Sequence, residues 1–192
     1  MFKKDSYLSA YLAGIAWLLY AYYFVIARDL LLSSLFLTLG GLLATKVFIA
    51  LYKMLKDKDE GFALIIMVLG VAGALGTMIH GGYDLANVIN PPVGMNATLP
   101  SQIDPRGLMA FGLTGLAVLK SGWLMGKDSK FSKNLSYLSL LSGVLLLVIY
   151  LNRLVVLDPS SPILKYSILI EGFVVNPIWY LWLGKIFQEK LK

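Results

Sequence analysis

Residues Gly70 to Asn90 read GVAGALGTMIHGGYDLANVIN, and this stretch guides the interpretation of the whole chain. It begins as an apolar, glycine-rich helix and ends in polar residues that include the one histidine of the sequence. Helical spacing puts one stripe of residues on a single face: Gly73, Gly76, Thr77, His80, Asp84 and Asn87. The glycine half can lie close against another helix, while the polar half presents an imidazole, a carboxylate and an amide.

The composition indicates that the chain lies in a membrane. Of its 192 residues, 58% are hydrophobic and 15% are charged, whereas soluble domains have about 45–50% apolar and about 25% charged residues. A spanning helix needs about 20 apolar residues, and six hydrophobic runs of that length use nearly the whole sequence. We therefore expect one transmembrane domain over residues 1–192, with the lipid bilayer as its main partner.

The predicted fold is an all-α integral membrane protein, a bundle of six transmembrane helices. The spans are expected at about 7–27, 30–52, 61–88, 107–125, 135–156 and 163–187. The lysines of Met1–Asp5 resemble the start of a signal peptide, but the apolar run after them is too long for one, so we interpret it as the first span. Prolines make Ile89–Arg106 the one long connection, because they stop helices.

The distribution of lysine and arginine predicts the orientation, because cytoplasmic loops are rich in both. One side of the predicted membrane receives most of the lysines: Lys3, Lys4, Lys53, Lys56, Lys58, Lys127, Lys130, Lys133, Lys185, Lys190 and Lys192. We expect cytoplasmic N- and C-termini and an external Ile89–Arg106 loop, in the plasma membrane of a prokaryote. Asn96-Ala97-Thr98 in that loop fits a glycosylation acceptor, a pattern with many false matches.

Six spans can also form two inverted three-helix halves, an arrangement found in many transporters. The third span of each predicted half contains a small residue, an aromatic residue and a following amide. These are Gly82-Tyr83 with Asn87, and Gly172-Phe173 with Asn176. The two groups lie at different depths in their spans, so this pattern supports the repeat only in part.

Glu171 is the ionisable residue that the sequence places deepest in the membrane. It follows Ile163 by eight residues, which is roughly 12 Å along a helix and near mid-bilayer. Such a group is costly and needs a partner or a function. It is either a proton or cation site, or a carboxyl group bonded to a neighbouring helix.

Further polar residues have two interpretations each. His80 and Asp84 meet on one helix face, as an ion pair, as half of a metal site, or as an ordinary polar helix end. Arg153 either reaches inward to Glu171 or Asp84, or extends to lipid headgroups. Asn176 precedes a proline, which kinks a helix and frees a carbonyl group that could bind a ligand.

Lys46 and Lys120 lie in the predicted cytoplasmic half of their spans. Each stands seven residues, roughly 10 Å, from a lysine at the inner boundary, Lys53 and Lys127 respectively. Either their ammonium groups extend to the membrane surface, or they line a cytoplasmic half-channel for anions or protons.

Several chemistries are excluded by what the sequence lacks. It has no cysteine, so thiolate metal sites and thiol nucleophiles are absent, and one histidine cannot supply a multi-histidine zinc or bis-histidine haem site. It also lacks H-E-x-x-H, a phosphate-binding loop, a dinucleotide fingerprint and the G-x-S-G motif of six-span serine proteases. We expect no cofactor, no resident metal and no nucleic-acid partner.

The leading functional hypothesis is a small transporter or channel-like protein for a small solute, ion or proton, with a polar vestibule open to the outside. Its pathway would use His80, Asp84, Asn87, Arg153, Glu171 and Asn176, with Lys46 and Lys120 on the inner side. One alternative is a membrane enzyme at the outer face, with His80 as base and Asp84 orienting it. Another is a non-catalytic subunit or assembly factor. The glycine-rich faces could also hold a second copy or a membrane partner.

The orientation can be tested with single cysteines, since the chain has none of its own. We predict that a cysteine at Asn96 reacts with an impermeant thiol reagent applied outside the cell, and that one at Ser132 does not. Labelling of position 132 but not of position 96 would reverse the orientation.

Overall fold

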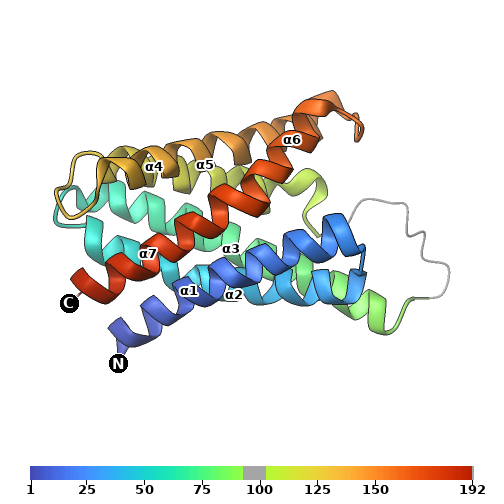
Figure 1. Ribbon diagram of the computed structural model, residues 1–192, viewed down its shortest axis with the longest axis horizontal. Coiled ribbons are helices and arrows are strands. Elements are labelled where there is room, and N and C mark those ends of the chain that lie inside the picture. Colours follow the sequence, from blue (N-terminus) through green and yellow to red (C-terminus); the bar gives the residue numbers. More distant parts are fainter. Residues whose placement is uncertain (93–102, 192) are drawn as a thin grey trace.

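The structure is a computed structural model that describes residues 1–92 and 103–191. The predicted acceptor Asn96-Ala97-Thr98 and most of the long proline-containing connection lie outside these residues. Every regular element within the described ranges is a helix (Figure 1). The α-helices are α1 (Phe2–Ala21), α2 (Leu30–Leu55), α3 (Glu60–Ile89), α4 (Thr114–Met125), α5 (Lys133–Leu151), α6 (Pro162–Ile170) and α7 (Asn176–Lys190).

Shorter, irregular helical turns continue several of these helices. Four are wider π-helical turns: η1 (Tyr22–Ala27), η3 (Leu108–Leu113), η4 (Asn152–Val156) and η5 (Glu171–Val175). A single 3₁₀ turn, η2 (Pro105–Gly107), precedes η3. Wide turns of this kind often occur at functional sites in helical proteins.

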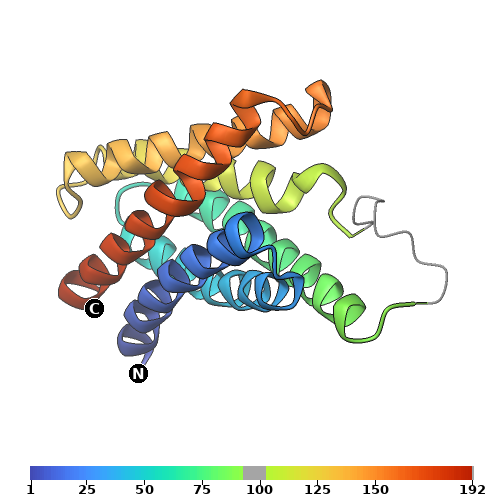
Figure 2. The same cartoon turned by 45° about the vertical axis from the view of Figure 1, so that its right-hand side comes forward.

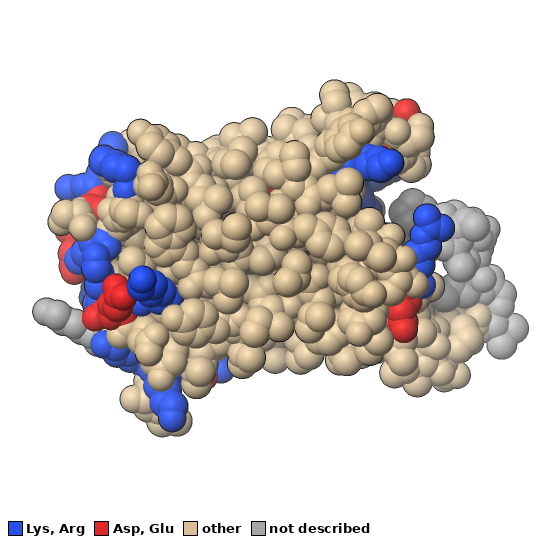
Figure 3. All heavy atoms as spheres, in the orientation of Figure 1, with Lys and Arg blue, Asp and Glu red and all other residues tan. Residues whose placement is uncertain are grey.

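Together these elements form six helices that are long and apolar enough to cross a membrane, which confirms the predicted six-helix, multi-pass membrane protein. The segments are Phe2–Ala27, Leu30–Leu55, Glu60–Ile89, Leu108–Met125, Lys133–Val156 and Pro162–Lys190. Several extend a few residues past the predicted spans, because helical hydrogen bonding continues beyond the apolar part of the sequence. On the face shown in the space-filling view, charged side chains gather at the two ends and are nearly absent from the middle (Figure 3).

The two ends of the bundle differ in charge. Both chain termini lie at the same end, together with the α2–α3 and α4–α5 connections (Figure 1). We call this the lysine-rich end, after Lys53, Lys56, Lys130 and Lys190. The opposite, lysine-poor end carries the α1–α2 and α5–α6 turns. Which end faces the cytoplasm, and whether the halves are inverted repeats, stay predictions.

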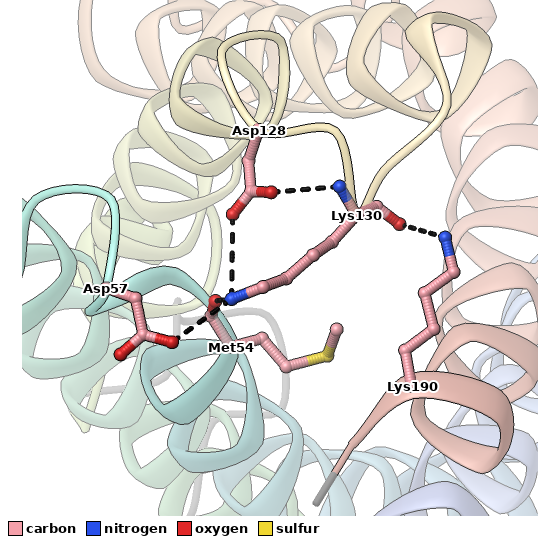
Figure 4. Close-up of polar contacts among 5 residues, drawn as sticks. All are labelled: Met54, Asp57, Asp128, Lys130 and Lys190. Carbon is pink, nitrogen blue, oxygen red and sulfur yellow. Dashed lines mark hydrogen bonds and ion pairs between the residues drawn. The ribbon is translucent and has the colours of Figure 1, made fainter.

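A polar network lies at the lysine-rich end (Figure 4). The Lys130 ammonium group donates to the Met54 carbonyl at 3.0 Å and to Asp57 at 3.2 Å, and it lies 3.9 Å from Asp128. Lys190 in turn donates to the Lys130 carbonyl at 2.6 Å. The network therefore joins the end of α2, the α4–α5 connection and the end of α7.

Local sequence explains where the helices begin. Asp29 accepts a hydrogen bond from the backbone N–H of Leu32, and Asp59 accepts one from Phe62, so each carboxylate satisfies a free donor of the first turn. The α1–α2 and α2–α3 connections are both short, because the chain turns just before each capping aspartate. In the α1–α2 turn Arg28 has a left-handed backbone with φ of 54°.

Helix α3 lies between α2 and the segment formed by η3 and α4. A Cβ atom at Gly41 would stand 2.6 Å from the Met78 backbone nitrogen of α3. A Cβ atom at Gly73 would stand 2.3 Å from the Thr114 hydroxyl oxygen and 2.9 Å from the Met109 carbonyl oxygen. Neither position has room for a side chain. The predicted contact of the glycine face with another span is confirmed.

The last span crosses the bundle diagonally (Figures 1 and 2). Its first part, α6, packs on α5, and its second part, α7, packs along α1. Gly14 of α1 is close enough for an added Cβ to reach the Pro177 carbonyl oxygen at 3.1 Å. The bend between the two parts falls at η5, directly before Pro177, as expected where proline removes a backbone donor.

We predict that Gly73→Ala lowers the free energy of unfolding by about 1–3 kcal/mol, because the added methyl group has no space against η3 and α4. Gly82→Ala, on the same helix, is the matched control, since a Cβ atom there meets nothing within 4 Å. The control should be neutral, or stabilising by up to about 1 kcal/mol through helix propensity. Equal effects in detergent unfolding experiments would contradict the packing described here.

Candidate functional site

A cavity of about 130 Å³ lies among the helices, from the lysine-poor half to the middle of the bundle, and every span contributes to its wall. Its volume corresponds to roughly four water molecules, at about 30 Å³ each. The wall is mainly apolar, with a set of aromatic side chains: Trp17, Tyr20, Phe24, Phe48, Phe111, Trp179 and Tyr180. The polar and charged side chains along it are Thr77, His80, Asp104, Thr114, Ser142, Arg153, Glu171 and Asn176.

Glu171 is one of the two buried carboxyl groups of this cavity, with only 2% of its surface exposed. Its Oε1 atom accepts a hydrogen bond of 2.6 Å from the Ser142 hydroxyl group on α5. Its Oε2 atom is also buried, and it has no hydrogen-bond partner among the described residues. A buried acceptor left in this way is costly, so the cavity presents one unsatisfied carboxyl oxygen.

The backbone around Glu171 explains part of this geometry. Glu171 is the first residue of the wide turn η5, and its carbonyl accepts from the Asn176 N–H five residues later. Pro177 follows and has no N–H to continue the α-helical pattern. The predicted irregularity at Asn176-Pro177 is therefore observed, and both Glu171 and Asn176 border the cavity.

Arg153 lies toward the lysine-poor end of the cavity and is half-buried. Its guanidinium carbon is 5.3 Å from the centroid of the Phe111 ring, which is a cation–π contact. No ion pair joins Arg153 to Glu171 or to Asp84 in the part of the chain that the structure describes. The ion pair of Arg153 with Glu171 or Asp84 that the sequence allowed is therefore not formed.

His80 and Asp84 form the pair that their spacing predicts, with Nε2 and Oδ2 3.2 Å apart. Their side chains are 19% and 37% exposed. His80 borders the cavity, whereas Asp84 and Asn87 do not, so the polar stripe only partly faces it. The Nδ1 atom of His80 is buried and has no partner among the described residues.

Lys46 and Lys120 lie away from the cavity. The Lys46 ammonium group forms an ion pair of 3.0 Å with Asp5 of α1. The Lys120 ammonium group lies 4.9 Å from the centroid of the Phe62 ring. Each ammonium group therefore has a nearby partner, and neither lysine borders the cavity near Glu171.

Asp104 is a cavity residue that the sequence analysis did not select. It is 3% exposed, and its two carboxylate oxygens each accept a backbone N–H at 3.0 Å, from Met109 and Ala110. It caps the start of the fourth span. The signal was available in the sequence, because an aspartate before a proline is a common helix start.

The serines of α5 were also missed. Ser136, Ser139 and Ser142 recur at spacings of three and are all buried. The Trp179 indole N–H donates to the Ser139 hydroxyl at 2.5 Å, one turn from the Ser142–Glu171 bond. A serine repeat within an apolar span is the pattern that could have indicated this polar face.

The lysine-rich side of the cavity is closed by packed side chains. Phe48, Trp179 and Tyr180 line the cavity, and the Trp179 and Tyr180 rings meet edge to face at 4.8 Å. Toward the lysine-rich end follow fully buried residues such as Leu51 and Leu183. The cavity therefore extends from the lysine-poor half to the middle of the bundle and ends at these side chains.

The chemistry that the cavity offers is binding and proton exchange. It brings together two carboxyl groups, one imidazole and one guanidinium group in a mainly apolar, aromatic enclosure. Within residues 1–92 and 103–191, no three His, Asp or Glu side chains are grouped so that they could hold a metal ion. Comparison of the chain with protein-family models, with curated proteins and with solved structures finds no match.

We predict that Glu171→Gln changes the free energy of unfolding by less than about 1 kcal/mol. The amide has nearly the same shape and can still accept from Ser142, and no described cation loses a partner. Chemical unfolding in detergent measures this. A loss of several kcal/mol would show that the carboxylate neutralises a buried cation.

Proposed function

We propose that this multi-pass membrane protein is a small transporter whose solute enters the cavity from the lysine-poor end and whose Glu171 carboxyl group exchanges a proton or cation during the cycle. The observation that carries the proposal is the buried, unpartnered Oε2 atom of Glu171 in a cavity. In a protein that used Glu171 only to bind a neighbouring helix, both oxygens would be expected to have partners.

The closed lysine-rich half supports transport over a permanent pore. A transporter exposes its binding site to one side at a time, and its broken helices surround the site. The last span is interrupted at η5, beside Glu171, and the fourth and fifth spans carry the wide turns η3 and η4. These turns are places where a helix can change direction when the other side opens.

The charge distribution supports the direction of access. If the lysine-rich end faces the cytoplasm, as the positive-inside rule predicts, the cavity faces outward. Arg153 and His80 then lie between the outer surface and Glu171 as the first polar groups that a solute meets.

An enzyme at the outer face is supported less well. The His80–Asp84 pair resembles a base with its orienting carboxylate. However, Asp84 does not border the cavity, and an outer-face reaction would leave the buried Glu171 without a role. A non-catalytic subunit would likewise leave the unpartnered oxygen unexplained.

Purified protein in liposomes loaded with a pH-sensitive dye tests the proposal. Small amines, carboxylic acids, sugars and inorganic cations are added outside in turn, and the internal pH is recorded. We predict solute-dependent proton movement with at least one class, because the solute and proton share Glu171. Glu171→Gln should reduce the initial rate roughly tenfold or more.

Glu189→Gln is the matched control, since Glu189 is exposed at the lysine-rich end, far from the cavity wall. It should retain the rate of the unmodified protein. Absence of proton movement with every class of solute, or equal rates for Glu171→Gln and the unmodified protein, would overturn the proposed function.

A further inference from the structure

We infer that the cavity binds a small organic cation, with its positive group at the free oxygen of Glu171 and its alkyl groups against the aromatic wall. The inference rests on the function proposed above, because it names the class of solute. It is carried by three properties of the cavity, which are its charge, its aromatic rings and its size.

The charge around Glu171 is not balanced by a neighbouring cation. Of the elements that pack on η5, α7 contributes Tyr180 and α1 contributes Tyr20 to the cavity, while α5 and α6 contribute no charged group. Across the cavity stand Arg153, His80 and Asp104.

Each of the facing titratable groups already has a neighbouring partner. Arg153 lies on the Phe111 ring, His80 pairs with Asp84, and both oxygens of Asp104 accept backbone N–H groups. A positively charged ligand at Glu171 would therefore supply the counter-charge that the described residues do not provide.

The aromatic wall favours an organic cation. Ring faces attract cations through their quadrupole, most strongly when water is excluded. Trp17 lies 6.4 Å from Tyr180, and Trp179 lies 4.8 Å from it, measured between ring centroids. The Arg153 contact with Phe111 shows that one ring of this same cavity already holds a cation.

The composition of the wall disfavours a bare inorganic ion. Hard cations need several oxygen ligands, about six to eight for Ca²⁺ and six for Mg²⁺. On its own side of the cavity Glu171 is accompanied by Ser142 and Asn176, while the other neighbours are mainly aromatic or aliphatic. The volume of about 130 Å³ is close to that of an apolar cavity, about 150 Å³, that holds benzene. A quaternary or primary alkylammonium ion of similar size fits this space.

Equilibrium binding of choline, used as the probe, tests the inference. Trp17 and Trp179 line the cavity, so their fluorescence in the detergent-solubilised protein reports occupancy. We expect saturable binding of choline and at least roughly tenfold weaker binding of 3,3-dimethyl-1-butanol, the neutral carbon isostere, because the charge supplies the ion-pair and cation–π energy. Potassium should not compete at equal concentration.

Variants assign the binding to Glu171. Glu171→Gln should weaken choline binding roughly tenfold or more, with little effect on the isostere, while Glu189→Gln should leave both unchanged. Lowering the pH should weaken choline binding to the unmodified protein, because protons compete for the same oxygen, and this dependence should be lost in Glu171→Gln. Equal binding of choline and its isostere, or potassium competing equally, would overturn the inference.

The test separates this inference from the proposed function. Choline binding without any solute-driven proton movement in liposomes would support the cation site and overturn transport. Proton movement driven by acids or sugars, with no binding of choline, would overturn the cation site and leave the transporter standing.

Discussion

The contact that the rest of the structure depends on is the one between α3 and its two neighbours. Backbone atoms of α2 and η3 approach α3 so closely that Gly41 and Gly73 have no room for a Cβ atom. Van der Waals contact between small residues is the main source of helix association in a bilayer, where water no longer drives apolar surfaces together. This contact holds the first three spans against the fourth, and it fixes which face of α3 carries His80 to the cavity. The remaining spans pack around this unit, α1 on α2 and α5 on α4.

The cavity forms where helices in the lysine-poor half depart from regular α-helical geometry. Wide turns interrupt the last span at Glu171 and begin the fourth at Leu108–Leu113, whereas the lysine-rich half consists of regular α-helices joined by the Lys130 network. The lysine-rich half also buries serine hydroxyl groups, and these have partners: Ser6 and Ser121 donate to carbonyl groups of their own helices, and Ser136 donates to the Gly122 carbonyl. The other half contains serine, threonine and carboxyl side chains, and it leaves space beside them. The asymmetry is the physical basis for the proposed one-sided access.

The sequence was sufficient for the fold class, because six long apolar runs leave few alternatives for a chain of this length. The sequence also predicted side-chain contacts within one helix, such as that of His80 with Asp84, because helical spacing sets those distances. It was insufficient for contacts between helices. Lys46 meets Asp5 of another span, and Glu171 meets Ser142, because the rotation and depth of each helix come from packing. For the same reason the cavity wall, collected from all the spans, could not be derived from any single run of residues.

We propose that the buried Glu171 carboxyl group is in contact with the solution at the lysine-poor end of the bundle. Infrared difference spectroscopy of the reconstituted protein measures it directly, with the carboxyl C=O band assigned by its loss in Glu171→Gln. We predict that this band changes reversibly when the pH is stepped at the lysine-poor end of the protein in oriented membranes. A Glu171 band that stays constant over the whole accessible pH range would contradict the claim and would leave the carboxyl group a sealed structural element.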